Sequence, residues 1–237
     1  MDAGRATLQT TFLASITAQV VALVLSIVAL AQDDVPGILR AVLIVGFVVA
    51  AIQFCWYVTA YAAYFGYGRE GALAIKWRYL DWYATTGIML LTLNLLIRFW
   101  RSRCISVADA FDDPGMWVAT IVAFVADALM LTCGLLVETE RVTDPDRETK
   151  VLFAGFVPFV AAFLPSFLLV RAYYSVEALL VTIATFLVWG AYGYIAIAYR
   201  DDVAGKALRY NLADIVSKNI FQVAVAIQVL ADSGAAC

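Results

Sequence analysis

Residues 211–230 read NLADIVSKNIFQVAVAIQVL, a run long enough to cross a membrane that nevertheless carries two charged side chains. A helix needs about 20 mainly apolar residues to span a bilayer. Asp214 and Lys218 are four residues apart, so in a helix they lie on one face, one turn from each other. A charged side chain in hydrocarbon costs several kcal/mol, and such residues usually face a cavity or a partner. The stretch therefore predicts a membrane-spanning helix that contributes a charged pair to the interior of a helical bundle.

The composition of the whole chain is that of a membrane protein with several spans. Of its 237 residues, 64% are hydrophobic and 15% are charged, whereas soluble domains contain about 45–50% apolar residues. Hydropathy predicts seven helices, at 9–31, 38–65, 77–99, 115–136, 150–170, 174–199 and 205–231. We therefore expect an all-α membrane protein, a single seven-helix bundle over residues 1–237, with its function inside the bundle. No cleavable signal peptide is evident.

Several classes of function lack the residues that they require. The chain has no histidine, which excludes His-based catalysis and most zinc sites. Its net charge is −3 and it has no basic block, so nucleic acid binding has no support. The four cysteines show no CxxC spacing, and we expect Cys55 and Cys133 to serve as small apolar residues within spans. We predict no metal site and no enzymatic activity.

The ionisable residues inside the spans are few. The predicted helices place these deep in the bilayer: Arg78, Asp81, Asp127, Asp214 and Lys218. In the third span Arg78, Asp81 and Thr85 share one face, and Thr92 lies on that face roughly 16 Å beyond Asp81. A lysine in a dry site is readily deprotonated and can form a Schiff base with an aldehyde. Asp81 and Asp214 are candidate counter-ions, and Arg78 would offset their mutual repulsion. The alternative is a buried polar network that only fixes helix packing.

Three sequence segments together carry a family likeness. WRYLDWYATT (77–86), VWGAY (188–192) and DIVSK (214–218) resemble the microbial rhodopsins, retinal-binding seven-helix proteins of the bacteriorhodopsin type, and the likeness extends over essentially the whole chain. The resemblance implies that all-trans retinal is bound to Lys218 as a Schiff base. It implies that Asp81 is the primary counter-ion and proton acceptor and that Asp214 is the second counter-ion. It also implies that Arg78, Tyr57 and Tyr192 gate the proton path.

The resemblance also implies a retinal pocket. Its expected members are Tyr79, Trp82, Thr85, Thr86, Met89, Asp127, Met130, Phe159, Trp189 and Ser217. Trp82 and Trp189 would lie on the two faces of the polyene, and Ser217 would shift the absorption to the blue. Any one of the aromatic residues taken alone could be ordinary core, and Asp127 could be a protonated, hydrogen-bonded residue in an apolar pocket.

The third-helix positions by which the family is sorted read Asp81, Thr85 and Thr92. An aspartate first is the pattern of outward proton pumps and of some sensors, and it disfavours chloride, sodium and inward proton pumps. Thr92 stands where efficient outward pumps carry the carboxylate that returns the proton, and threonine cannot deliver a proton of suitable acidity. Lys206 stands where a glutamate is often found, with Asp201 or Asp202 as partial substitutes.

We therefore expect an outward proton pump that cycles slowly because the medium returns the proton. The alternative is a photosensory rhodopsin that signals through a separate transducer protein. A channel is less favoured, because the spans lack the rows of acidic side chains expected along a cation path.

The expected setting is the plasma membrane, with lipid around the bundle, a homo-oligomeric assembly and the N-terminus outside. The distribution of basic residues conflicts with that orientation. With the N-terminus outside, the cytoplasmic loops would carry five Lys and Arg and the outer loops nine, whereas basic residues normally gather on the cytoplasmic side. The resemblance and the charge distribution thus favour opposite orientations.

Overall fold

The computed structural model describes residues 3–69, 71, 74–139, 141–142 and 144–232. These residues form helices joined by short connections, and none of them lies in a β-strand. The α-helices are α1 (Ala3–Leu30), α2 (Gly37–Tyr61), α3 (Arg78–Arg101), α4 (Val107–Phe111), α5 (Pro114–Glu138), α6 (Pro145–Ala172), α7 (Val176–Ala198), α8 (Val203–Asp214) and α9 (Phe221–Asp232). Further helical turns are the π-helices η1 (Ala62–Gly66) and η4 (Ile215–Ile220) and the 3₁₀-helix η3 (Ile75–Trp77).

Seven segments of the described chain are long and apolar enough to cross a membrane. They are Gly4–Leu30, Gly37–Gly66, Ile75–Arg101, Pro114–Glu138, Asp146–Ala172, Val176–Ala198 and Val203–Ala231. Their number and order confirm the predicted all-α, seven-helix membrane fold, and the chain is an integral membrane protein.

Some helices extend beyond the predicted spans because polar residues cap their ends. α6 begins at Pro145, five residues before the predicted start, since the side chain of Asp144 accepts a hydrogen bond from the backbone N–H of Asp146 at 3.0 Å. α5 begins in the same way, with Asp113 accepting from the Gly115 N–H at 2.8 Å. An aspartate N-cap followed by proline is a favourable helix start, yet hydropathy alone reads it as loop.

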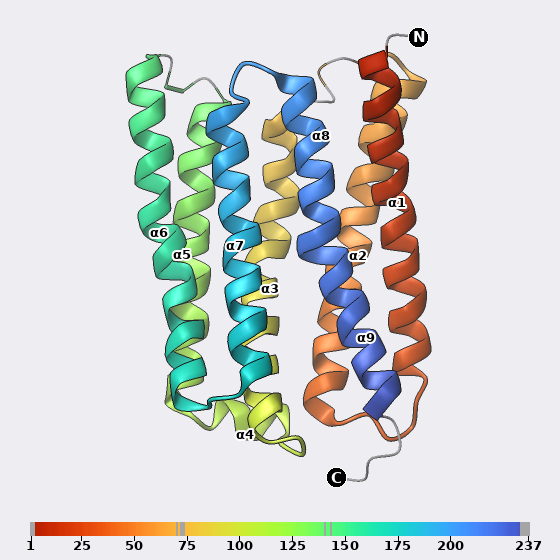
Figure 1. Ribbon diagram of the computed structural model, residues 1–237, viewed down its shortest axis with the longest axis vertical. Helices are drawn as coiled ribbons and strands as arrows, with labels where there is room; N and C mark the ends of the chain where they lie inside the picture. The colour runs from red at the N-terminus through yellow and green to blue at the C-terminus, as the bar shows by residue number, and fades with distance from the viewer. Residues whose placement is uncertain (1–2, 70, 72–73, 140, 143, 233–237) are drawn as a thin grey trace.

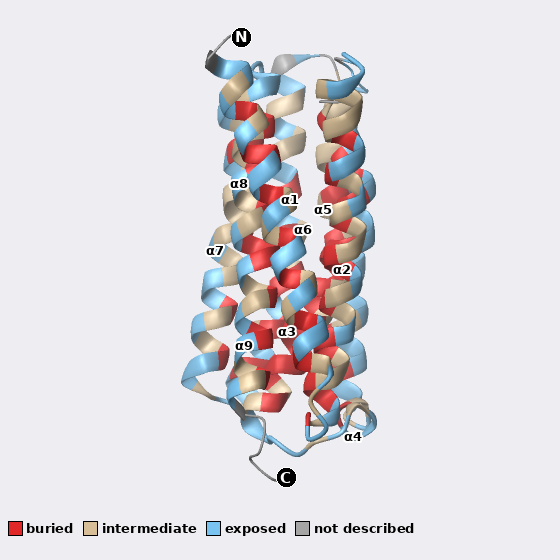
Figure 2. Cartoon of the chain, turned by 90° about the vertical axis from the view of Figure 1, so that its right-hand side faces the viewer, coloured by how far each residue is buried: buried red, intermediate tan, exposed pale blue. Residues whose placement is uncertain are grey.

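The spans close into a bundle around α3. α1 packs against α2 on one side and against α8 and α9 on the other, which closes the ring (Figure 1). α3 packs against α2, α5, α6 and α7, and 72% of its most apolar stretch is buried, against 22–44% for the other spans. Figure 2 shows the buried residues gathered on the inward faces of the helices. The end of the bundle at which α1 begins is called the N-terminal end below, and the opposite end the C-terminal end.

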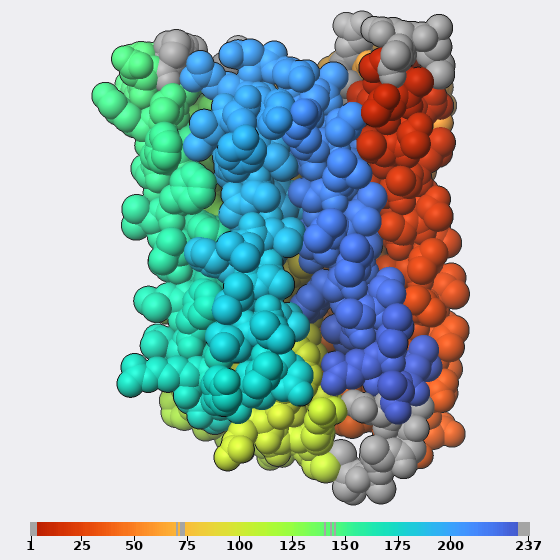
Figure 3. Space-filling view, viewed as in Figure 1, coloured from red at the N-terminus to blue at the C-terminus, as the bar shows by residue number. Residues whose placement is uncertain are grey.

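The outer surface of the bundle is apolar, as a lipid-facing surface must be. Large hydrophobic side chains are exposed on every side, among them Ile27, Leu129, Val157, Leu180 and Leu187. Figure 3 shows the face on which α6, α7, α8, α9 and α1 lie side by side. An exposed apolar surface of this extent would cause aggregation in water and is suited to lipid.

The seventh span is not a regular α-helix. α8 ends at Asp214, the π-helix η4 follows, and α9 begins at Phe221. A π-turn is wider than an α-turn and often occurs at a functional site. Here three consecutive side chains, those of Ser217, Lys218 and Asn219, are buried together. The wide turn therefore directs the side chains of Lys218 and of both its neighbours into the interior of the bundle.

Candidate functional site

Lys218 of η4 lies in a buried cluster of charges. Its Nζ donates a hydrogen bond to Asp81 Oδ2 at 2.9 Å and another to Thr85 Oγ1 at 3.3 Å. Asp214 Oδ1 lies 3.6 Å from the same nitrogen. The side chains of the lysine and of both aspartates are at most 3% exposed. Since buried charges are tolerated only when paired, the lysine offsets the charge of each aspartate, whereas the two carboxylates repel each other.

Asp214 is bound by a second set of donors. Arg78 Nη1 lies 2.9 Å from Asp214 Oδ2, and Tyr57 OH donates to the same oxygen at 2.8 Å. Tyr192 OH donates to the other oxygen at 2.8 Å. In contrast, Asp81 Oδ1 is buried with no hydrogen-bond partner among the described residues. The two carboxylates beside Lys218 are therefore chemically unequal.

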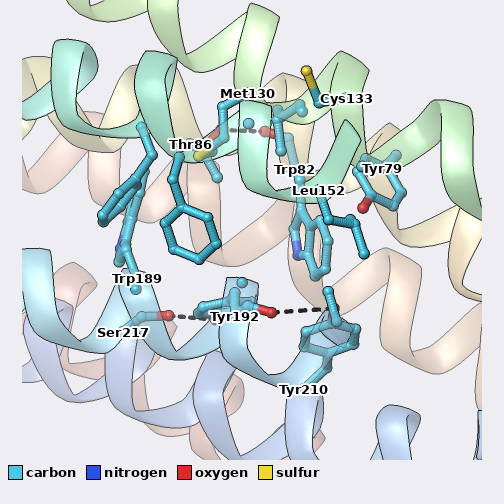
Figure 4. A pocket seen from close by; sticks show the side chains of 18 of the residues that line it. Tyr79, Trp82, Thr86, Met130, Cys133, Leu152, Trp189, Tyr192, Tyr210 and Ser217 are labelled. Carbon is cyan, nitrogen blue, oxygen red and sulfur yellow. Dashed lines mark hydrogen bonds between the residues drawn. The ribbon is translucent and has the colours of Figure 1, made fainter. Parts of the chain in front are cut away.

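A largely apolar cavity lies beside Lys218, and Figure 4 shows side chains of its wall, among them Trp82, Trp189 and Tyr192. The space in the cavity that the centre of a water-sized sphere can reach is about 100 Å³. Seven of the predicted pocket residues line it, namely Tyr79, Trp82, Thr86, Met130, Phe159, Trp189 and Ser217. Tyr192 lines it as well, and its hydroxyl is 2.7 Å from Ser217 Oγ. An apolar cavity with few polar groups that ends at a reactive side chain is typical of a small-molecule site.

Glycines allow aromatic rings to come close to the helices that line this cavity. A Cβ added at Gly134 of α5 would lie 2.2 Å from Tyr79 Oη, and one at Gly193 of α7 would lie 2.6 Å from Phe156 Cζ. Both distances are far below van der Waals contact. A larger side chain at either position would displace a ring of the cavity wall, so these glycines help to set the shape of the cavity.

Other predicted pocket residues lie outside the large cavity. Asp127 Oδ2 accepts a hydrogen bond from Thr86 Oγ1 at 2.6 Å, which ties α5 to α3 behind the cavity wall. Met89 lines a separate, smaller cavity, together with Thr92. Lys218 lines both cavities and therefore stands between them.

The sequence did not predict the role of Asn211. Its Oδ1 accepts a hydrogen bond from Arg78 Nη2, and its Nδ2 donates to Thr11 Oγ1 at 3.0 Å. The amide thereby links the arginine to α1. Asn211 precedes Asp214 by three residues, so on the predicted helix the two side chains share a face. This spacing could have identified Asn211 as a member of the site.

The sequence also did not predict the partner of Lys206. This buried lysine of α8 pairs with Glu138 Oε1 at 2.8 Å, at the last residue of α5. Asp202 caps α8 by accepting from the Gly205 N–H at 2.7 Å, and the side chain of Asp201 is 93% exposed. Glu138 thus places a carboxylate at the N-terminal end of the bundle, beside the lysine that stands in the expected glutamate position.

Comparison with known proteins agrees with this architecture. The family described as bacteriorhodopsin-like protein matches residues 6–230. Among solved structures, the chain is similar to the viral rhodopsin OLPVRII, with a TM-score of 0.77 and 19% identity over 94% of this chain and 98% of that one. It is similar to a thermophilic rhodopsin, with a TM-score of 0.74 and 21% identity over 97% and 95% of the two chains.

A third similar structure is halorhodopsin, a light-driven chloride pump, with a TM-score of 0.71 and 15% identity over 96% of this chain and 97% of that one. No curated protein matches the chain. Identities this low show a shared fold. Because the family match spans nearly the whole sequence, the chain belongs to the bacteriorhodopsin-like family, the microbial rhodopsins.

Proposed function

We propose that this chain binds all-trans retinal covalently through Lys218 and acts as a light-driven outward proton pump. The observation that carries the proposal is the buried contact of Lys218 Nζ with Asp81 Oδ2 at 2.9 Å, beside the apolar cavity. The residues fit the cofactor, because a lysine reaches a cavity with two tryptophans, Trp82 and Trp189, in its wall. Bound retinal supplies the absorption of light and a change of shape at the lysine nitrogen.

The hydrogen bonds around the two carboxylates determine which of them accepts the proton from Lys218 Nζ. Tyr57, Tyr192 and Arg78 surround Asp214, and hydrogen bonds to a carboxylate favour its charged form. Asp81 lacks such support at Oδ1 and lies closer to the lysine. Asp81 is therefore the acceptor, while Asp214 remains charged and holds Arg78 in place.

The same carboxylate decides which ion is moved. Halorhodopsin has this fold and is a chloride pump, so the fold alone does not select the ion. In this chain Asp81 occupies the position beside Lys218 that a mobile anion would need. A carboxylate there can accept a proton and disfavours a bound anion through repulsion between like charges.

The direction of transport follows from where the groups lie along α3. Asp81 is in the first turn, near the N-terminal end, and Thr92 lies about three turns further toward the C-terminal end. A proton that passes from Lys218 to Asp81 moves toward the N-terminal end. With that end outside the plasma membrane, as we propose, the net movement of protons is outward.

One observation favours a photosensor as the second candidate. Thr92 is buried, and its hydroxyl donates a hydrogen bond to the Ile88 carbonyl at 3.0 Å. Because this residue is not a carboxylic acid, no carboxyl group returns the proton to Lys218 from this position. A slow return would leave a long-lived state for a transducer to recognise. A sensor would not build a proton gradient, which separates it from the pump.

Attachment of retinal is tested by two lysine variants. Lys218 and Lys206 are both buried, and each pairs with a carboxylate. We expect Lys218→Ala to give no visible absorption band after addition of all-trans retinal, because the aldehyde has no amine to react with. Lys206→Ala, the matched control, should form the band. A normal visible band in Lys218→Ala would overturn the assignment.

A further inference from the structure

Two buried amides beside Lys218 lack hydrogen-bond partners. The side chain of Gln53 on α2 is 0% exposed and that of Asn219 on η4 is 2% exposed. The Oε1 and Nε2 of Gln53 and the Oδ1 and Nδ2 of Asn219 make no hydrogen bond with the described residues. Four such atoms on two side chains that line one cavity are unusual, since buried polar side chains are nearly always hydrogen-bonded.

Both amides line the smaller cavity, on the other side of Lys218 from the large one. Met89, Thr92 and Gln222 also line that cavity, and the space in it that the centre of a water-sized sphere can reach is about 10 Å³, which is room for about one water molecule. Its other polar side chains already have partners. Gln222 Nε2 donates to Ser26 Oγ at 2.9 Å, and the Thr92 hydroxyl donates within its own helix. The unmet hydrogen-bonding capacity therefore belongs to Gln53 and Asn219.

Water is the ligand that suits these groups. An amide offers both donors and an acceptor, carries no charge, and so has no preference for a cation or an anion. Polar cavities that adjoin unpaired buried groups hold water molecules with two to four hydrogen bonds each, whereas apolar cavities stay dry. Two amides facing one cavity can supply that number of bonds.

We propose that Gln53 and Asn219 bind water beside Lys218, and that this water returns the proton to Lys218 Nζ. The second part of the proposal rests on the pump function proposed above. As a proton from solvent at the C-terminal end binds to the water oxygen, one of the water's own O–H bonds breaks and the N–H bond at Lys218 Nζ forms, so the water is regenerated. The amides orient the water without taking the proton themselves. Acceptor and donor then lie on opposite sides of the lysine, with Asp81 toward the N-terminal end.

The surrounding residues explain why this supply would be slow. Beyond the cavity, α2, α3 and α9 continue to the C-terminal end with buried apolar side chains of one core cluster: Leu39 and Val42 on α2, Leu93 and Leu96 on α3, and Val225 and Val229 on α9. We call these six residues the apolar plug. Because they separate the bound water from solvent, a proton can be replaced only when the plug opens.

The binding of water is tested by a high-resolution experimental structure of the wild-type protein in the dark. We expect ordered water within hydrogen-bonding distance of both Gln53 and Asn219, and its loss in Gln53→Leu and Asn219→Leu. A dry cavity, or amides paired with each other, would overturn the proposal. This outcome does not depend on transport, whereas a wild-type protein with no visible band after addition of retinal would overturn the function proposed above instead.

The return of the proton is tested by flash spectroscopy of the same variants. Recovery of the proton at Lys218 Nζ should be about tenfold slower or more in Gln53→Leu and Asn219→Leu. The matched control is Asn94→Leu, because Asn94 is an equally buried amide that bonds to Ser166 and does not line this cavity. If Gln53→Leu does not fold, Gln53→Met keeps an unbranched side chain of similar length. Recovery at the wild-type rate in both amide variants would overturn the role in proton return.

Discussion

Thr92 lies on the C-terminal side of Lys218, at the wall of the smaller cavity. It is 2% exposed, and its hydroxyl donates to the Ile88 carbonyl at 3.0 Å. That bond uses the only proton of the side chain, and a threonine hydroxyl is too weak an acid to protonate an amine. A proton that returns to Lys218 past this residue must therefore come from the solvent.

Replacing Thr92 by aspartate should change the kinetics of that return. In the wild type we expect the recovery at Lys218 to slow about tenfold for each unit of rising pH, because the step consumes protons from the solvent. Thr92→Asp places a carboxyl group at the cavity wall, where it can act as an internal donor, so recovery should be faster and less dependent on pH. Flash spectroscopy between pH 5 and 9 measures both effects, with Thr92→Asn as the uncharged control. A wild-type recovery that does not vary with pH would show that another internal donor exists.

The charged residues of the site could be predicted from the sequence, but its buried amides could not. Arg78, Asp81 and Lys218 stand out because a charge in an apolar run is costly. Gln53 and Asn219 are also deeply buried, yet an amide in a span is common enough to pass unnoticed. Their significance depends on which partners are missing, and only the three-dimensional arrangement shows that.

Pairing across helices was predictable only where a family pattern supplied it. Glu138 and Lys206 are 68 residues apart, and Glu138 ends α5, where a hydropathy reading expects loop. The π-helix η4 was not predictable either, because its sequence is equally compatible with a regular α-helix. The wide turn is favoured because it allows Lys218 and its neighbours Ser217 and Asn219 to be buried in the bundle together.

Asp113 joins three elements at the C-terminal end of the bundle. It caps α5, accepts a hydrogen bond from the Tyr173 hydroxyl at the end of α6, and lies 3.9 Å from Arg98 Nη1 of α3. The hydrogen bond from Tyr173, together with that from the Gly115 N–H, lowers the pKa of the Asp113 carboxyl below its usual value. The charged form therefore stabilises the folded state.

This cap predicts a stability that depends on pH. Because the pKa of Asp113 is lowered in the folded protein, its contribution should be complete above about pH 4 and should disappear as the pH falls through the folded pKa. At pH 7, Asp113→Ala should lower the free energy of unfolding by about 0.5–2 kcal/mol. Unfolding in detergent measures the effect, and Asp112→Ala, an exposed neighbour, is the control. An equal loss of stability at pH 2.5 and pH 7 would contradict the role of the carboxylate.

The bundle as a whole presents two ends with different charge. Five Lys and Arg lie in the helix ends and connections of the C-terminal end and nine in those of the N-terminal end. The positive-inside rule would place the N-terminal end in the cytoplasm, whereas the proposed outward pump requires it outside. The orientation therefore decides whether the path from Lys218 to Asp81 exports or imports protons.

Cysteine labelling of intact cells determines the orientation. Cys104 is exposed in the connection between α3 and α4, at the C-terminal end. In a Cys237→Ser background, a membrane-impermeant maleimide should label Cys104 only after the cells are permeabilised. Asp201→Cys, at the exposed opposite end, should be labelled without permeabilisation. Labelling of Cys104 in intact cells would place the C-terminal end outside and reverse the proposed direction.

The most direct test of the pump is the pH of the medium when cells that contain the protein and retinal are illuminated. We predict acidification that begins with the light, that a protonophore abolishes, and that is absent in Asp81→Asn, because this variant keeps the lysine and loses the acceptor. A protein with a normal visible band that produces no change in pH, or an alkalinisation, would contradict the outward proton pump.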